Sequence, residues 1–270
     1  MNNHCGKLTV IGAGAMGYAF AEGVIRQGLC EPKSVTVSDI DASKLSFAST
    51  RLGVSTTHDN KEAVKGARVI LIAVKPSVVP IVLNEIRDAL QSDQLLISIA
   101  AGVRLAAIES RLPPQSKVIR AMPNIACKVG RGAIAYARGS VVEEEDVKTA
   151  RTVLEAVGLC VEVPENLMNA VTGLSGSGPA YVFVLIESLA DAGVRLGLPR
   201  DTALTLAAQT VLGSAHMVIG TAEHPAKLKD LVASPGGTTI AGLDALEHAG
   251  FRSAIIDAVK AAAARADELG

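Results

Sequence analysis

The feature that most constrains this chain is a glycine-rich turn at residues 12–17, Gly-Ala-Gly-Ala-Met-Gly, with the spacing GxGxxG. The apolar residues 8–11 before it predict a strand, and residues 18–26 after it predict a helix. In that context Gly12 permits the tight turn, Gly14 lets a pyrophosphate approach bare backbone, and Gly17 lets helix and strand pack closely. The alternative is an ordinary glycine-rich turn, but its placement favours a dinucleotide-binding turn that also includes Ala13, Ala15 and Met16.

From residue 7 to about residue 164, short apolar runs alternate with helical stretches. Strands are predicted at residues 8–11, 35–37, 68–74, 95–99, 118–121, 133–137 and 159–163, and the intervening helices include residues 15–27, 78–90 and 143–157. This alternation predicts a mainly parallel, doubly wound sheet. Ligands of such sheets lie beyond the carboxyl ends of the strands, which makes further cofactor-binding candidates of Ser38, Asp39, Lys75, Pro76, Ala100, Ala101, Met122, Pro123 and Asn124.

Several of these candidates have two interpretations. Asp39 lies about 20 residues beyond the turn, where an acid binds the ribose 2′-hydroxyl of NAD, whereas Ser38 could bind a 2′-phosphate. Asp39 or Asp41 could instead cap the helix predicted to start near residue 42. Lys75 could reach a phosphate or ribose or be merely solvated, and Asn124 could orient a nicotinamide or form a structural Asx turn.

Beyond residue 164 the strand signals stop, so we place a domain boundary between residues 1–164 and residues 165–270. The second part predicts helices at about residues 166–172 and 179–196, one opened at residue 199, one after residue 225, and two from about residues 239 and 251. Residues 203–222 and 166–186 carry no charge. Polar residues, Gly and Pro within these runs argue against a membrane span, so we expect buried helices whose covering is completed by another subunit.

Charge and cysteine usage exclude several classes of protein. The formal net charge is −1, with no long basic run, so nucleic acid is not an expected partner. The four cysteines are far apart in sequence and form no CxxC pair, and no apolar signal segment opens the sequence. We therefore expect reduced thiols in a cytoplasmic protein, without a metal site.

One loop of the second part is a candidate for anion binding. Residues 234–239 read Ser-Pro-Gly-Gly-Thr-Thr and precede a predicted helix. Gly236 and Gly237 free the backbone amides, which together with the helix dipole suit a small carboxylate. At least one of Thr238 and Thr239 is expected to be the N-cap, which leaves the other hydroxyl for substrate.

The motifs together resemble the pyrroline-5-carboxylate reductase family over nearly the whole chain. They are GAGAMG at residues 12–17, AVKP at 73–76, SIAAGV at 98–103, IRAMPN at 119–124, GLSGSGPAYVF at 173–183, GLPR at 197–200 and EHPAKLKDLVASPGGTTIAGL at 223–243. The last is the most diagnostic, because glycine turns occur in many families.

The resemblance implies a Rossmann-like doubly wound domain followed by an all-helical dimerisation and substrate domain. It implies NAD(P)H-dependent reduction of 1-pyrroline-5-carboxylate to L-proline, and a homodimer that assembles into a higher oligomer. Positions matching cofactor contacts are Ala13, Ala15, Met16, Ser38, Asn60, Val74, Lys75 and Ala101, and those matching the substrate loop and its surroundings are Glu223, Ser234, Gly237, Thr238 and Thr239. The family commonly prefers NADPH, which conflicts with the NAD interpretation of Asp39; we lean to NADPH and keep NADH open.

The chemistry fits these residues. A ring carbon doubly bonded to nitrogen accepts hydride, and the Thr239 hydroxyl hydrogen-bonded to that nitrogen supplies orientation. Family members often carry Thr where this chain has Ile125, so one polar contact near the nicotinamide is expected to be missing. Two alternatives are a β-hydroxyacid dehydrogenase, disfavoured because no lysine lies between Lys148 and Lys227, and a non-catalytic NAD(P) sensor, which has no use for a carboxylate loop.

Overall fold

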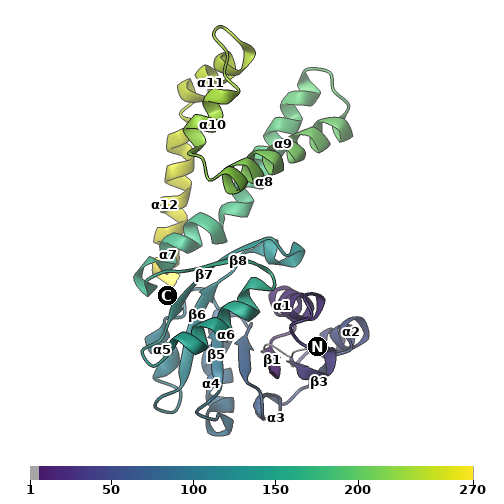
Figure 1. Ribbon diagram of the computed structural model, residues 1–270, viewed down its shortest axis with the longest axis vertical. Coiled ribbons are helices and arrows are strands. Elements are labelled where there is room, and N and C mark those ends of the chain that lie inside the picture. The colour runs from purple at the N-terminus through teal and green to yellow at the C-terminus, as the bar shows by residue number, and fades with distance from the viewer. Residues whose placement is uncertain (1–5, 270) are drawn as a thin grey trace. The chain divides into compact units, whose positions relative to one another are not determined.

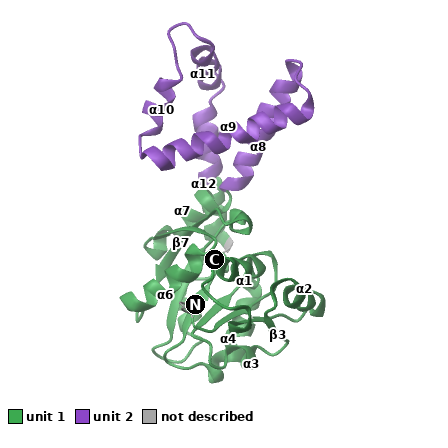
Figure 2. Ribbon diagram, turned by 45° about the vertical axis from the view of Figure 1, so that its right-hand side comes forward, with its two compact units in different colours: residues 1–177, 261–270 green, residues 178–260 purple. Residues whose placement is uncertain are grey.

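The computed structural model describes residues 6–269 and divides the chain into two compact units. Unit 1 comprises residues 1–177 and 261–270, and unit 2 comprises residues 178–260 (Figure 2). The first division lies inside the segment that the sequence assigned to the helical domain. Residues 165–177 thus belong structurally with the sheet.

Unit 1 is built on one eight-stranded sheet (Figure 1). Its strands are β1 Leu8–Ile11, β2 Val35–Ser38, β3 Ser55–Thr57, β4 Val69–Ile72, β5 Leu95–Ser98, β6 Lys117–Met122, β7 Gly132–Arg138 and β8 Gly158–Glu162. They lie in the order β3-β2-β1-β4-β5-β6-β7-β8, and every pair is parallel except β6 with β7. The predicted doubly wound architecture is confirmed.

Helices cover both faces of this sheet because alternate strand residues point to opposite sides. Leu71 of β4 packs with α1 Ala15–Arg26, α2 Ala42–Leu52 and α6 Glu144–Glu155. Its neighbours Ile70 and Ile72 pack instead with α3 Asn60–Val64, α4 Val79–Ile86 and α5 Leu105–Glu109. The buried faces of the central strands therefore read as continuous apolar runs, the pattern from which they were predicted.

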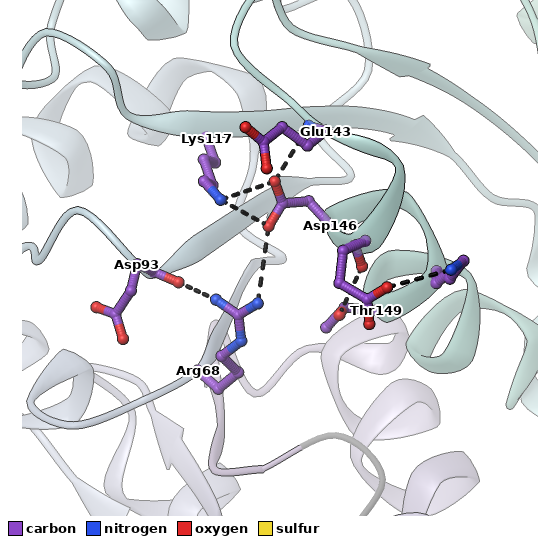
Figure 3. Close-up of polar contacts among 8 residues, drawn as sticks. Arg68, Asp93, Lys117, Glu143, Asp146 and Thr149 are labelled. Carbon is purple, nitrogen blue, oxygen red and sulfur yellow. Dashed lines mark hydrogen bonds and ion pairs between the residues drawn. The ribbon is translucent and has the colours of Figure 1, made fainter.

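A buried carboxylate fixes the start of α6 (Figure 3). Asp146 is 1% exposed and accepts from the backbone N–H of Glu143 at 3.1 Å, forming a capping box. The Lys117 ammonium lies 2.9 Å from the same carboxylate, and the Arg68 guanidinium lies 3.7 Å from it. The network ties α6 to the ends of β4 and β6.

Unit 2 is helical, as predicted. It contains α8 Gly178–Arg195, α9 Arg200–Thr221, α10 Pro225–Leu231, α11 Thr238–His248 and the first part of α12 Phe251–Leu269, whose remainder belongs to unit 1. The short α7 Met168–Val171 and a π-helical turn at Thr172–Gly176 precede α8. Helices α8 and α9 pack on each other through Ala190, Ala203 and Ala207.

Much apolar surface of α8 and α9 is exposed in the single chain. Phe183, Leu206 and Leu212 are each more than half exposed. Helix α9 is long and apolar enough to cross a membrane, yet only 11% of its most apolar window is buried within the chain. We expected this helix to be buried with the help of another subunit, and a single copy of the chain does not bury it.

The structure corrects one expectation about cysteines. We expected reduced thiols throughout, but Cys30 is disulfide-bonded. The expectation rested on the wide spacing of the cysteines in the sequence, and that spacing does not limit how close residues lie in the fold. Cys127 and Cys160 are free and buried, and Cys5 lies outside the described residues. Burial raises the pKa of the Cys127 thiol to about 11 and that of Cys160 to about 12.

Candidate active site

The glycine turn has the geometry that its sequence predicts. Gly12 has φ +106°, and a Cβ there would lie 2.5 Å from the Ala73 carbonyl oxygen. A Cβ on Gly17 would lie 1.9 Å from the Gly12 carbonyl oxygen, so strand and helix touch at this point. An added Cβ at Gly14 would meet none of the described atoms within 4 Å. Gly14 thus presents open backbone at the N-terminus of α1.

That N-terminus suits a phosphate. Gly14 is the N-cap of α1, and no side chain in the described part of the chain caps it. The amides of the first helical turn, Ala15 and Met16 among them, have no intrahelical acceptor and align with the positive end of the helix dipole. The residues present therefore fit the pyrophosphate of a dinucleotide.

The end of β2 holds the turn in place through Asp39. The backbone N–H of Ala13 donates to Asp39 Oδ2 at 2.7 Å, and the N–H of Asp41 donates to Asp39 Oδ1 at 2.9 Å. Asp41, rather than Asp39, caps α2 by accepting from the N–H groups of Ser43 and Lys44. Asp39 therefore does not cap α2; its carboxylate accepts a hydrogen bond from the glycine turn instead.

Ser38 lies at the same edge but is fully buried. Its hydroxyl donates to Asn60 Oδ1 at 2.7 Å, and the Asn60 amide donates to Glu85 at 2.7 Å. The Ser38 side chain therefore faces α3 within the fold, and a contact with a 2′-phosphate stays a prediction.

Three further strand ends lie along the carboxyl edge beside the glycine turn. After β4, Lys75 is exposed and occupies the N-cap position of a 3-10 turn that begins at Pro76, and after β5 Ala101 is exposed. After β6, the Asn124 amide donates to the Ser175 carbonyl at 3.0 Å and accepts from the backbone N–H groups of Ala126 and Ala133. This Asx turn is the structural alternative for Asn124; the cofactor roles of Val74, Lys75, Pro76, Ala101, Met122, Pro123 and Asn124 stay predictions.

A cavity of about 590 Å³ adjoins the glycine turn. Besides Ala13, Gly14 and Ala15, residues that we did not predict line it, namely Tyr18, Ala19, Glu22, Ser43, Lys44, Phe47 and Lys128. The rings of Tyr18 and Phe47 lie 5.2 Å apart between α1 and α2. Burial, together with Glu22, raises the pKa of Tyr18. No sequence motif marked these residues, because the surfaces of α1 and α2 that carry most of them come together only in the folded chain.

The anion-binding loop lies between α10 and α11 in unit 2. Gly236 has φ +67°, a left-handed conformation that favours glycine, and a Cβ on Gly237 would lie 2.2 Å from Ser234 Oγ, a side-chain atom that could rotate away. Gly237, rather than Thr238 or Thr239, is the N-cap of α11, which corrects the expected cap. The reason is that Gly237 already has extended backbone, which places both threonines inside the first helical turn.

The loop therefore leaves its donors available. The first-turn amides of α11 lack a side-chain cap among the described residues, and no hydrogen bond of the Thr238 or Thr239 hydroxyl occurs there. Glu223 lies at the connection after α9, where its carboxylate pairs with Lys227 at 2.6 Å. The arrangement can hold a small carboxylate and present a hydroxyl beside it.

Known proteins resemble nearly the whole of this chain. Residues 165–269 match the family described as pyrroline-5-carboxylate reductase dimerisation, and residues 7–102 match NADP oxidoreductase coenzyme F420-dependent. The pyrroline-5-carboxylate reductase of Methanosarcina acetivorans is 46% identical over 98% of this chain and 98% of its own length. This chain belongs to the pyrroline-5-carboxylate reductase family.

Solved structures agree with this assignment. A pyrroline-5-carboxylate reductase from Coxiella burnetii is 37% identical, covers 98% of this chain and 99% of its own, and superposes with a TM-score of 0.94. The Plasmodium falciparum pyrroline carboxylate reductase, solved with NADP bound, is 33% identical over 99% of both chains, with a TM-score of 0.88. As a pyrroline-5-carboxylate reductase, this chain is an oxidoreductase that uses NAD(P)H to reduce 1-pyrroline-5-carboxylate to L-proline.

Proposed function

We propose that unit 1 binds the nicotinamide dinucleotide at the carboxyl edge of its sheet and that the loop at residues 234–239 binds the substrate. When bound, the reduced nicotinamide supplies a hydride for the imine carbon. The observation that carries the proposal is the uncapped start of α11 behind Gly236 and Gly237. Its free amides match the carboxylate that distinguishes this substrate from a simple cyclic imine.

Thr239 supplies the positioning group. Its hydroxyl donates to, or accepts from, the ring nitrogen according to whether that nitrogen carries a proton. When the ring nitrogen is protonated, the imine carbon is already electrophilic. Thr239 therefore needs to orient the ring rather than act as a strong acid. Ser234, Gly236, Gly237 and Thr238 hold the carboxylate, and Glu223 lies at the neighbouring connection.

The cofactor is a nicotinamide dinucleotide held by Gly12, Ala13, Gly14, Ala15, Met16 and Gly17 of the glycine turn. The family resemblance favours NADPH, and NADH is the other candidate. Ser38 and Asp39 at the end of β2, together with Asn60 at the start of α3, decide between the two.

The exposed apolar faces of α8 and α9 support a homodimer formed through the helical region, and further association of dimers is part of the proposal. Covering α9 with a second copy accounts for its apolar length without a membrane. Cytoplasmic location and the absence of nucleic-acid partners complete the proposal, in keeping with the net charge of −1.

The test is oxidation of NADPH and of NADH, followed at 340 nm with pyrroline-5-carboxylate and matched enzyme concentrations. We expect rapid substrate-dependent oxidation and formation of proline. The matched control is a cyclic imine without the carboxylate, which should react far more slowly because the loop has nothing to hold. Protein that binds a dinucleotide but oxidises neither cofactor would favour the sensor, and reaction with a β-hydroxyacid and NAD(P)⁺ would favour the dehydrogenase; the comparisons favour neither.

A further inference from the structure

We propose that Asp39 makes NADH, rather than NADPH, the preferred cofactor of this chain. The inference rests on the proposed binding of a dinucleotide at the glycine turn, and it opposes the preference that the family resemblance suggests. It concerns the adenosine end of the cofactor, where the two dinucleotides differ by one 2′-phosphate.

The position of the Asp39 carboxylate is fixed by two backbone donors. One oxygen accepts from the N–H of Ala13 inside the glycine turn, and the other accepts from the N–H of Asp41. The residue is half-buried, so the group is held at the edge of the sheet rather than moving freely in solvent. A carboxylate bonded to the turn that binds the pyrophosphate lies within reach of the adjoining ribose.

The Asp39 carboxylate can accept further hydrogen bonds, and these suit the hydroxyls of a ribose rather than a phosphate. Each oxygen has a second lone pair, so together they can accept from the 2′- and 3′-hydroxyls of a ribose. A 2′-phosphate brings further negative charge and acceptor oxygens to an acceptor-only group. At a partly exposed site that repulsion is worth roughly 10- to 100-fold in affinity.

The side chains of residues 38–44 that could hold a 2′-phosphate already have partners within the fold. The Ser38 hydroxyl donates to Asn60 inside the fold. The Ser43 hydroxyl donates to Asp41 at 2.6 Å, and the Lys44 ammonium lies 3.5 Å from the same carboxylate. Residues 38–44 thus carry two carboxylates against one ammonium, and His58 Nδ1 lies 2.9 Å from the Asp39 carbonyl oxygen.

The experiment measures kcat/KM with each cofactor and, separately, dissociation constants for NADH and NADPH from nicotinamide fluorescence without substrate. We expect the wild-type chain to favour NADH about tenfold or more in both measurements. In Asp39→Asn the single side-chain oxygen can accept from Ala13 but no longer from Asp41 as well, and the charge is lost, so the ratio should shift about tenfold or more toward NADPH. Asp39→Ser, which is smaller, should shift it in the same direction.

The matched control is Asp59→Asn, at the N-cap of α3. Asparagine caps helices as well as aspartate does, and this carboxylate accepts from the N–H groups of Lys61 and Glu62 rather than from the glycine turn, so the cofactor ratio should stay that of the wild type. Circular dichroism of each variant shows whether it is folded.

Equal or tighter binding of NADPH by the wild-type chain would overturn the proposal, as would an Asp39→Asn ratio identical to the wild-type ratio. In that case Lys128, the other lysine of the 590 Å³ cavity, becomes the candidate for the phosphate. Because binding is measured without substrate, failure of the reductase assignment would appear as absence of turnover with either cofactor and leave the binding result intact.

Discussion

At the scale of single residues, backbone constraints explain more of this site than charged side chains do. Gly12, Gly17 and Gly237 each occupy a position where a Cβ would lie 2.5 Å or less from a neighbouring oxygen. Gly14 and Gly237 are the N-caps of α1 and α11, so glycine backbone lies at one helix N-terminus in each unit. The chemistry that remains for side chains is positioning, which a hydroxyl such as that of Thr239 can perform.

Replacing Thr239 by Val should lower kcat about 100-fold, because the isosteric side chain removes the hydroxyl that positions the ring nitrogen. KM for the cofactor should change little, since the glycine turn is untouched. Steady-state kinetics measure both, and Thr239→Ser, which keeps the hydroxyl, should retain most of the turnover. An unchanged kcat in Thr239→Val would remove the residue from the mechanism.

Cys127 and Cys160 should resist alkylation in the folded protein. Burial raises the pKa of these thiols to about 11 and about 12, so the reactive thiolate is scarce below those values. Iodoacetamide at pH 8 should therefore modify them only after unfolding, as mass spectrometry of native and urea-treated samples would show. Rapid labelling of either in the native protein would contradict the burial.

At the scale of elements, the sequence predicted the strands that are apolar and missed the one that is not. Strand β3 reads Ser-Thr-Thr, is largely exposed and lies at the edge of the described sheet beside β2, so neither apolar alternation nor burial marks it. The same limit applies to the site. The motifs GxGxxG and SPGGTT specify local backbone conformation, so they could be recognised in the sequence. The hydrogen bond from the Ala13 N–H to Asp39 and the cavity lined by Tyr18, Phe47 and Lys128 depend on packing between elements, which the sequence does not display.

The anchoring of α6 should depend on the Asp146 carboxylate. Asp146→Asn removes the charge that faces Lys117 and Arg68, and we expect a loss of about 1–3 kcal/mol in the free energy of unfolding, since both cations are partly solvated. Urea titration measures it. The control is Glu145→Gln, whose pair with Lys148 is well exposed and should change stability by less than about 1 kcal/mol. Equal effects of the two variants would contradict the structural role of Asp146.

At the scale of the whole molecule, one chain leaves too much apolar surface on its helical unit to stand alone. Residues of α8 and α9 such as Phe183, Leu206 and Leu212 are more than half exposed, and these helices lie in the segment that matches the dimerisation family. A second copy would cover surface of the kind that a monomer rarely exposes in contiguous patches.

Leu212→Glu should shift the protein from dimer toward monomer, because it places a charge on the apolar face of α9. Light scattering after gel filtration measures the mass. Ile81→Glu, which alters a similarly exposed apolar residue of α4 in unit 1, should leave the assembly unchanged. An undiminished mass for Leu212→Glu, or dissociation by Ile81→Glu, would place the interface elsewhere.

The path of α12 has a consequence for biosynthesis. Its residues 251–260 belong to unit 2 and its residues 261–269 to unit 1, where Asn169 hydrogen-bonds Asp267. Unit 1 is therefore discontinuous: all of unit 2 is translated between its two segments. A ribosome-bound chain can form the glycine turn and the sheet early, but the nucleotide-binding unit acquires its last segment only after the helices of unit 2 have been synthesised.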